Sequence, residues 1–135
     1  VANRGREVAV ATRPAFLPST MSAAASTGAE VVRRSAEQAD TAATECWSAL
    51  LGGCDSPGRR VLPQRLRQLA DATAFYAGTA WWYGDGSRHR TRIARARERI
   101  EEAVAERDGA EFAEAFIGYD EAVATAVMRV GSMIK

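Results

Sequence analysis

Residues 81–99 combine aromatic, histidine and arginine side chains that are suited to binding anions and planar groups. An aromatic triplet and a glycine turn precede an arginine-rich segment that contains the only histidine. Guanidinium groups beside indole rings suit stacking on bases and contacts with phosphates or acidic peptides. The free N–H groups at a helix start favour anions as well. The sequence therefore predicts a partner- or nucleic-acid-binding surface made of Trp81, Trp82, Tyr83, Arg88, His89, Arg90, Arg92, Arg95 and Arg99.

The arginine-rich segment continues into an acidic one. Residues 86–99 carry one acid, Glu98, whereas residues 100–121 carry one arginine, Arg107, among many acids. A helix that starts basic and ends acidic is opposed to its own dipole. Such an arrangement needs compensation from neighbouring elements or from a ligand.

Catalytic patterns are missing from the rest of the sequence. His89 is the only imidazole, and neither cysteine is expected near it. A di-iron bundle needs Glu-x-x-His, but the residue three before His89 is Gly86. Metal-ligand spacings, the dinucleotide-binding glycine pattern and the phosphate-loop motif do not occur. We therefore expect a protein without enzymatic activity, cofactor or metal.

Length and composition indicate one helical domain. The chain has 135 residues and a net charge of +1, which does not favour bulk nucleic-acid binding. Abundant alanine favours closely packed helices. The use of arginine in place of lysine, except at Lys135, suggests a GC-rich, actinobacterial genome. No apolar run has membrane-spanning length, and residues 1–20 lack a signal-peptide pattern, so we expect a cytoplasmic protein without membrane contact.

Hydrophobic spacing predicts an all-α fold: an up-and-down antiparallel bundle of three to four helices with an irregular N-terminal tail. The tail spans residues 1–27, with Val8 and Val10 as a short extended piece and Phe16 and Leu17 as an apolar anchor. Residues 28–135 form a single helical-bundle domain. The expected helices span residues 28–51, 63–83, 87–107 and 110–133.

Individual residues refine these helices. Ser26 or Thr27 is expected to cap the first helix, and Pro63 to begin the second. The second half of that second helix is apolar all round, which predicts a place at the centre of the bundle. We expect Cys46 to be a small buried side chain and Cys54 to be an incidental thiol; a disulfide between them across Gly52-Gly53 is the alternative.

Antiparallel packing predicts two differently charged ends. One end brings Arg59, Arg60, Arg65 and Arg67 close to Glu101, Glu102 and Glu106, which compensates the acidic end of the third helix. The other end gathers the aromatic triplet and the basic helix start with Arg33, Arg34, Arg129 and Lys135. We expect this second end to keep an excess of positive charge.

Three interpretations of that end remain open. Aromatic residues at a helix end are typical of core lids, and arginine-rich faces are typical of solvated surfaces. As a function, we expect association with an acidic protein partner or self-association into a homo-oligomer; nucleic-acid binding is the alternative. The alanine-rich seam from Val32 to Leu50 is a second candidate interface.

A further resemblance lies in Trp82-Tyr83-Gly84 between two antiparallel helices. It resembles the W-x-G turn of the small helical proteins exported by type VII secretion, and it implies a secretion-associated role as a minor alternative. That family's C-terminal Tyr-x-x-x-Asp/Glu signal is absent, because the residues four after Tyr76, Tyr83 and Tyr119 are Ala80, Ser87 and Val123. The chain is also longer than the family's usual hairpin.

Overall fold

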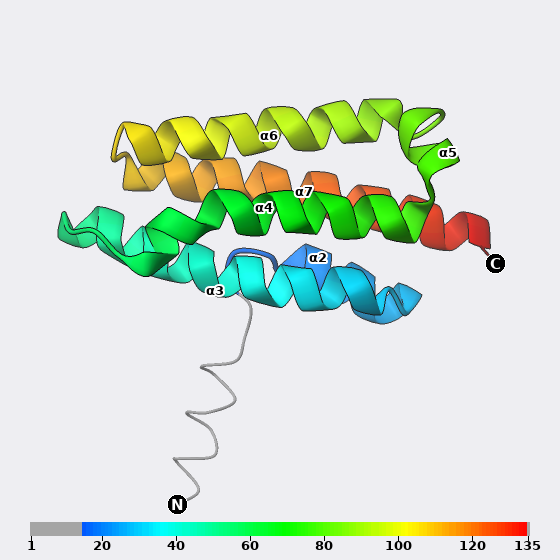
Figure 1. Cartoon of the computed structure of the whole chain (residues 1–135), viewed down its shortest axis with the longest axis horizontal. Helices are drawn as coiled ribbons and strands as arrows, with labels where there is room; N and C mark the ends of the chain where they lie inside the picture. Colours follow the sequence, from blue (N-terminus) through cyan, green and yellow to red (C-terminus); the bar gives the residue numbers. More distant parts are fainter. Residues whose placement is uncertain (1–14, 135) are drawn as a thin grey trace, which may run out of the picture.

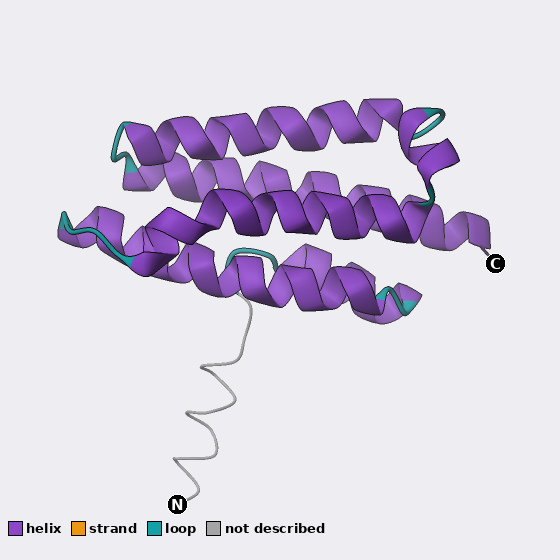
Figure 2. Cartoon of the chain, in the orientation of Figure 1, coloured by secondary structure: helices purple, strands orange, loops and turns teal. Residues whose placement is uncertain are grey.

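The computed structural model describes residues 15–134, and these residues form helices joined by short loops (Figure 2). The predicted all-α fold is confirmed. The helices are α2 (Pro18–Thr27), α3 (Glu30–Gly52), α4 (Pro57–Ala77), α5 (Thr79–Tyr83), α6 (Ser87–Ala105) and α7 (Gly109–Ile134). Val8, Val10 and Lys135 lie outside the described residues.

The helices pack in two layers (Figure 1). Helices α3, α4 and α6 lie side by side, and α2 and α7 lie behind them. The hairpins α3–α4 and α6–α7 are antiparallel, as expected from their short connections. Helix α6 forms one edge of the molecule, where it packs mainly on α7.

The expected irregular tail is wrong for residues 18–27, which form α2 and pack against α3 and α7. Ser26 and Thr27 therefore end α2 and do not cap α3. Gly28 closes α2 in the left-handed conformation, with φ 70°, and the residue before α3 is Ala29, whose side chain makes no cap. The Ser/Thr/Ala run Ser19–Thr27 is helical because its small residues pack on α3 and α7, a tertiary effect that outweighs weak local periodicity.

The second expected helix has different bounds. It starts at Pro57, where the Ser56 Oγ accepts a hydrogen bond from the Arg59 N–H at 3.1 Å, so Pro63 lies inside it. It ends at Ala77 because Gly78, with φ 90° and ψ 140°, leaves the helical conformation. Residues 79–83 form the separate helix α5.

Helix α7 is the central helix of the bundle, and the expectation that residues 63–83 would occupy the centre is wrong. The expected seam of α7 is buried from Phe112 to Val130, and only Met133 at its end is exposed. In α4, by contrast, the Phe75 side chain is 80% exposed. The break at Gly78 places the aromatic end of that segment on the surface.

Two buried carboxylates hold the N-terminal end of α2. Asp40 of α3 accepts hydrogen bonds from the N–H groups of Ala15, Phe16 and Leu17, at 2.7 to 3.1 Å for its Oδ1. Asp120 of α7 accepts those of Ser19 and Thr20 at 3.0 and 2.8 Å. Pro18 has no N–H, so the donors that a helix start leaves free all find an acceptor here.

The expected apolar anchor of the tail is confirmed. Leu17 is fully buried, and the Phe16 ring makes edge-on contacts with Trp47, Phe112 and Phe116, at centroid distances of 5.2 to 5.9 Å. The anchor thus ties the segment before α2 to both α3 and α7. Its position depends on the carboxylates that fix the adjacent backbone.

We expect Asp40→Ala to lower the free energy of unfolding by about 1–3 kcal/mol, since it leaves backbone N–H groups without their acceptor. Urea unfolding followed by circular dichroism measures the change. Asp71→Ala, at an exposed position of α4, is the matched control and should show no comparable loss. Equal stabilities of the two variants would show that Asp40 does not hold α2.

Candidate functional site

The junction between α5 and α6 brings most of the predicted surface residues together. The Trp81 carbonyl accepts hydrogen bonds from the N–H groups of Gly84 and Gly86, at 3.1 and 2.7 Å. The Ser87 Oγ donates to the Tyr83 carbonyl at 3.0 Å. The end of α5 is thereby fixed on the start of α6, because its last carbonyls have partners.

Trp81 forms a shelf at this junction. Its ring stacks on the His89 imidazole, with centroids 5.6 Å apart and an interplanar angle of 21°. The Trp81 ring also lies against Gly86, where a Cβ atom would be 2.5 Å from the ring. The glycine is therefore required for the indole to lie against the turn.

Arg90, Trp82 and Tyr83 hold the junction together. The Arg90 Nε donates to the Trp82 carbonyl at 3.3 Å, and its guanidinium lies 4.9 Å from the centre of the Tyr83 ring. The Trp82 ring is buried, so it acts as a core lid and is not available to a partner. Tyr83 stays 65% exposed. Trp82-Tyr83-Gly84 therefore follows the break at Gly78 and closes a short helix.

Arg99 belongs to an internal ion pair. Its Nε and Nη2 contact the Glu111 carboxylate at the start of α7, at 2.5 and 3.1 Å. The hydrogen bond from Arg99 lowers the pKa of Glu111, and it raises the pKa of Arg99. The pair fastens α6 to α7 and removes Arg99 from the surplus of positive charge.

Arg88, Arg92 and Arg95 form the free part of the predicted surface. All three are exposed, and no carboxylate among residues 15–134 lies within 4.0 Å of their guanidinium groups. They lie on one face of α6 because residues three or four apart are neighbours on a helix. We call these three residues the basic face of α6.

The pKa of His89 is affected by the charges around this face. Burial lowers its pKa from the ordinary value of 6.5, and the nearby charges of Arg88, Arg129 and Arg92 lower it further. Arg129 comes from the end of α7, so two helices contribute cations around one imidazole. Arg129 was expected at this end of the bundle, but it is not among the predicted site residues. The pattern that could have identified it is its position near the end of an antiparallel neighbour.

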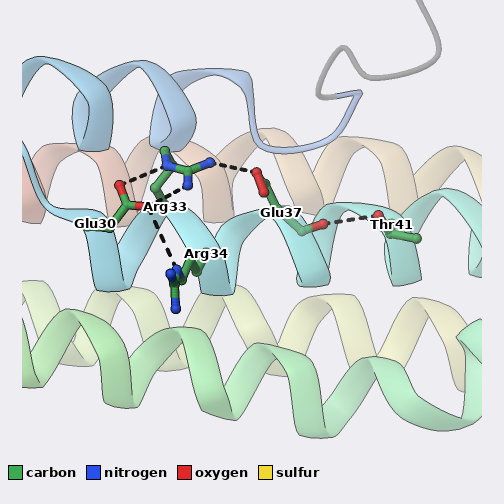
Figure 3. Close-up of polar contacts among 5 residues, drawn as sticks. All are labelled: Glu30, Arg33, Arg34, Glu37 and Thr41. Atoms are coloured by element: carbon green, nitrogen blue, oxygen red, sulfur yellow. Dashed lines mark hydrogen bonds and ion pairs between the residues drawn. The ribbon is translucent and has the colours of Figure 1, made fainter. Parts of the chain in front are cut away.

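Contrary to expectation, Arg33 and Arg34 of α3 do not add to the surplus of positive charge at this end (Figure 3). Arg33 bridges Glu30 and Glu37 along its own helix, and Arg34 lies 3.8 Å from Glu30. The hydrogen bond from Arg33 lowers the pKa of Glu30. Pairs three or four residues apart thus neutralise this part of the end locally.

At the opposite end, the expected proximity is partly realised. Arg59 and Glu101 line the same small cavity of about 70 Å³ between α4 and α6. Within residues 15–134, however, no arginine of α4 lies within 4.0 Å of Glu101, Glu102 or Glu106. Arg60 pairs with Asp55, and Arg65 donates to Gln38 and Gln68. The acids that end α6 therefore lack direct ion-pair partners in the described chain.

The prediction of a second interface, the seam from Val32 to Leu50, is wrong. Its residues from Val32 to Cys46 are fully buried and Leu50 is half-buried, because α4 and α2 pack over α3 inside one molecule. The two cysteines are free, Cys46 buried and Cys54 exposed, so the expectation without a bridge is confirmed.

Two other classes of site leave no trace in the described part of the chain. Residues 15–134 hold no group of three or more His, Cys, Asp or Glu side chains placed to bind a metal ion. None of their helices combines the length and apolar character needed to cross a bilayer.

Comparisons with protein-family models, with curated proteins and with solved structures find no match to this chain. The site is therefore interpreted from its own geometry.

We expect Arg129→Gln to raise the pKa of His89 towards its ordinary value, because it removes one of the charges that oppose protonation. An NMR titration of the single imidazole measures the shift, and Arg67→Gln on α4 should leave it unchanged. In the unmodified sequence, His89 takes up its proton at a higher pH when the chain is unfolded than when it is folded. The free energy of unfolding should therefore fall as the pH falls below about 6.5.

Gly86→Ala should displace the Trp81 ring from His89, since the new Cβ atom lies too close to the indole. The imidazole then loses its cover, so its pKa should rise and its ring-proton shifts should move. Gly118→Ala, where a Cβ atom meets nothing within 4 Å, is the control. An unchanged His89 spectrum in Gly86→Ala would contradict the stacked arrangement.

Proposed function

We propose that this protein works by association, without catalysis, and that the basic face of α6 binds an acidic protein surface. The observation that carries the proposal is that Arg88, Arg92 and Arg95 are exposed without a carboxylate partner in the described chain, beside the Trp81–His89 shelf. Other arginines of the sequence-predicted surface have internal roles.

The physical basis is the cost of bringing like charges together. Arg88 and Arg92 repel protonation of His89, and Arg129 adds to that field from α7. An acidic partner would relieve this repulsion and would meet guanidinium groups that need not break an existing ion pair. Charge complementarity of this kind favours partner choice and fast association more than tight binding.

The length of the basic face favours a protein carboxylate over nucleic acid. From Arg88 to Arg95 the face spans about 10 Å, since a helix rises about 1.5 Å per residue. Beyond it, the exposed residues Glu98, Glu102 and Glu106 carry the opposite charge. A phosphate backbone following α6 would meet these acids, whereas a short acidic segment would not.

The test is binding of a fluorescently labelled poly-glutamate peptide, followed by anisotropy at low ionic strength. We expect saturable binding that weakens with salt, and a loss of about tenfold or more in affinity for Arg88→Glu with Arg92→Glu. The control, Arg60→Glu with Arg67→Glu, changes the net charge equally on α4 and should retain most of the binding.

A single-stranded oligonucleotide of equal charge provides the competing outcome. If it binds more tightly than the peptide and loses binding with the same α6 variant, nucleic acid is the ligand class. If the peptide does not bind, or if both double variants weaken it equally, the basic face is not a specific site for acidic chains.

A further inference from the structure

The exposed face of α6 changes sign along its length. Arg88, Arg92 and Arg95 occupy its first half, and Glu98, Glu102 and Glu106 occupy its second half, all of them exposed; Arg99, which also lies in the second half, is paired with Glu111 of α7. Because these positions repeat at three- and four-residue intervals, they lie along one side of the helix. The face is therefore a linear charge pattern, positive and then negative.

Helix α7, the main neighbour of α6, does not compensate this pattern. In the antiparallel hairpin, Arg129 lies by the basic half of α6, near His89. Asp108, just before α7, and Glu111 and Glu114 in its first turns lie beside the acidic half, where Arg99–Glu111 is the ion pair that the described residues form between the two helices. Like charges thus accumulate at both ends of the hairpin.

We propose that the partner of this face is a second copy of the chain, with the two α6 helices side by side and antiparallel. In that arrangement, Arg88 lies opposite Glu106 of the second copy and Arg92 lies opposite Glu102, while Arg95, Glu98 and the internally paired Arg99 of both copies meet near the middle of the two helices. Each opposition occurs twice, because a two-fold axis near the middle of α6 repeats it. The proposal rests on the proposed function, since it uses the same three arginines.

Two further features support a second copy. Helix α6 is at the edge of the molecule, so its outer face is not covered by another described helix (Figure 1). Antiparallel α6 helices would also place each basic N-terminal end beside the negative dipole end of the other copy. The compensation that the charge order of α6 lacks within one molecule is thereby supplied by an identical helix.

The expected association is weak and dependent on salt. Exposed ion pairs each contribute about 0–1 kcal/mol, and contacts below about 1,200 Å² belong to transient complexes. The dimer should therefore form at high protein concentration and low ionic strength, and should dissociate as salt screens the charges.

The experiment is a charge exchange followed by sedimentation at 50 mM and 500 mM salt. The unmodified chain should form dimers at low salt. Arg92→Glu and Glu102→Arg should each remain monomeric, because each homodimer would place like charges opposite one another. An equimolar mixture of the two variants should form dimers, as should the double variant, because opposite charges then face each other again.

Glu102→Arg separates this inference from the proposed function. It should lose self-association yet retain binding of the poly-glutamate peptide, since the basic face is intact. Monomers of the unmodified chain at low salt, or a mixture that stays monomeric, would overturn the antiparallel dimer. The proposed function would survive that result if the peptide still binds, and would fail with it if the peptide does not. Circular dichroism verifies that each surface variant is folded.

Discussion

The structure depends on two buried carboxylates at the start of α2: Asp120 accepts the first N–H groups of the helix, and Asp40 accepts those of the three residues before it. Asp40 and Asp120 come from α3 and α7, so one short helix start connects both layers of the bundle. A buried carboxylate is costly without hydrogen-bond donors, and a helix start leaves donors without acceptors. Each satisfies the other. The Phe16 ring then fills the space between Trp47 and the phenylalanines of α7.

The arginines fall into two groups, those with an interaction partner within the chain and those without a carboxylate partner. Arg33, Arg90 and Arg99 each contact a carboxylate, a carbonyl or an aromatic ring within the chain. Arg88, Arg92 and Arg95 have no carboxylate partner among residues 15–134, because α6 occupies the edge of the bundle and turns this face outwards. The abundance of arginine along the sequence says little about function; the position of each one in the fold separates structural from available charge.

The α6–α7 hairpin as a whole has a basic end and an acidic end. Its basic end is organised by the Trp81–His89 shelf and its acidic end by the Arg99–Glu111 pair. A net charge of +1 conceals this polarity, because the two ends nearly cancel. Association through such an element depends on the arrangement of charge and little on its total.

Local propensity and a period of 3.6 residues are enough to predict the helical class, the helices near residues 30–52, 87–105 and 109–134, and the buried seam of α7. The amino-acid sequence also locates the aromatic and arginine-rich segment. It does not predict α2, whose start is capped by residues distant in the chain, or the break at Gly78 that leaves Phe75 exposed. Which charges are paired depends on the tertiary packing. Ion pairs such as Arg99–Glu111 form between helices, and their geometry depends on how those helices pack.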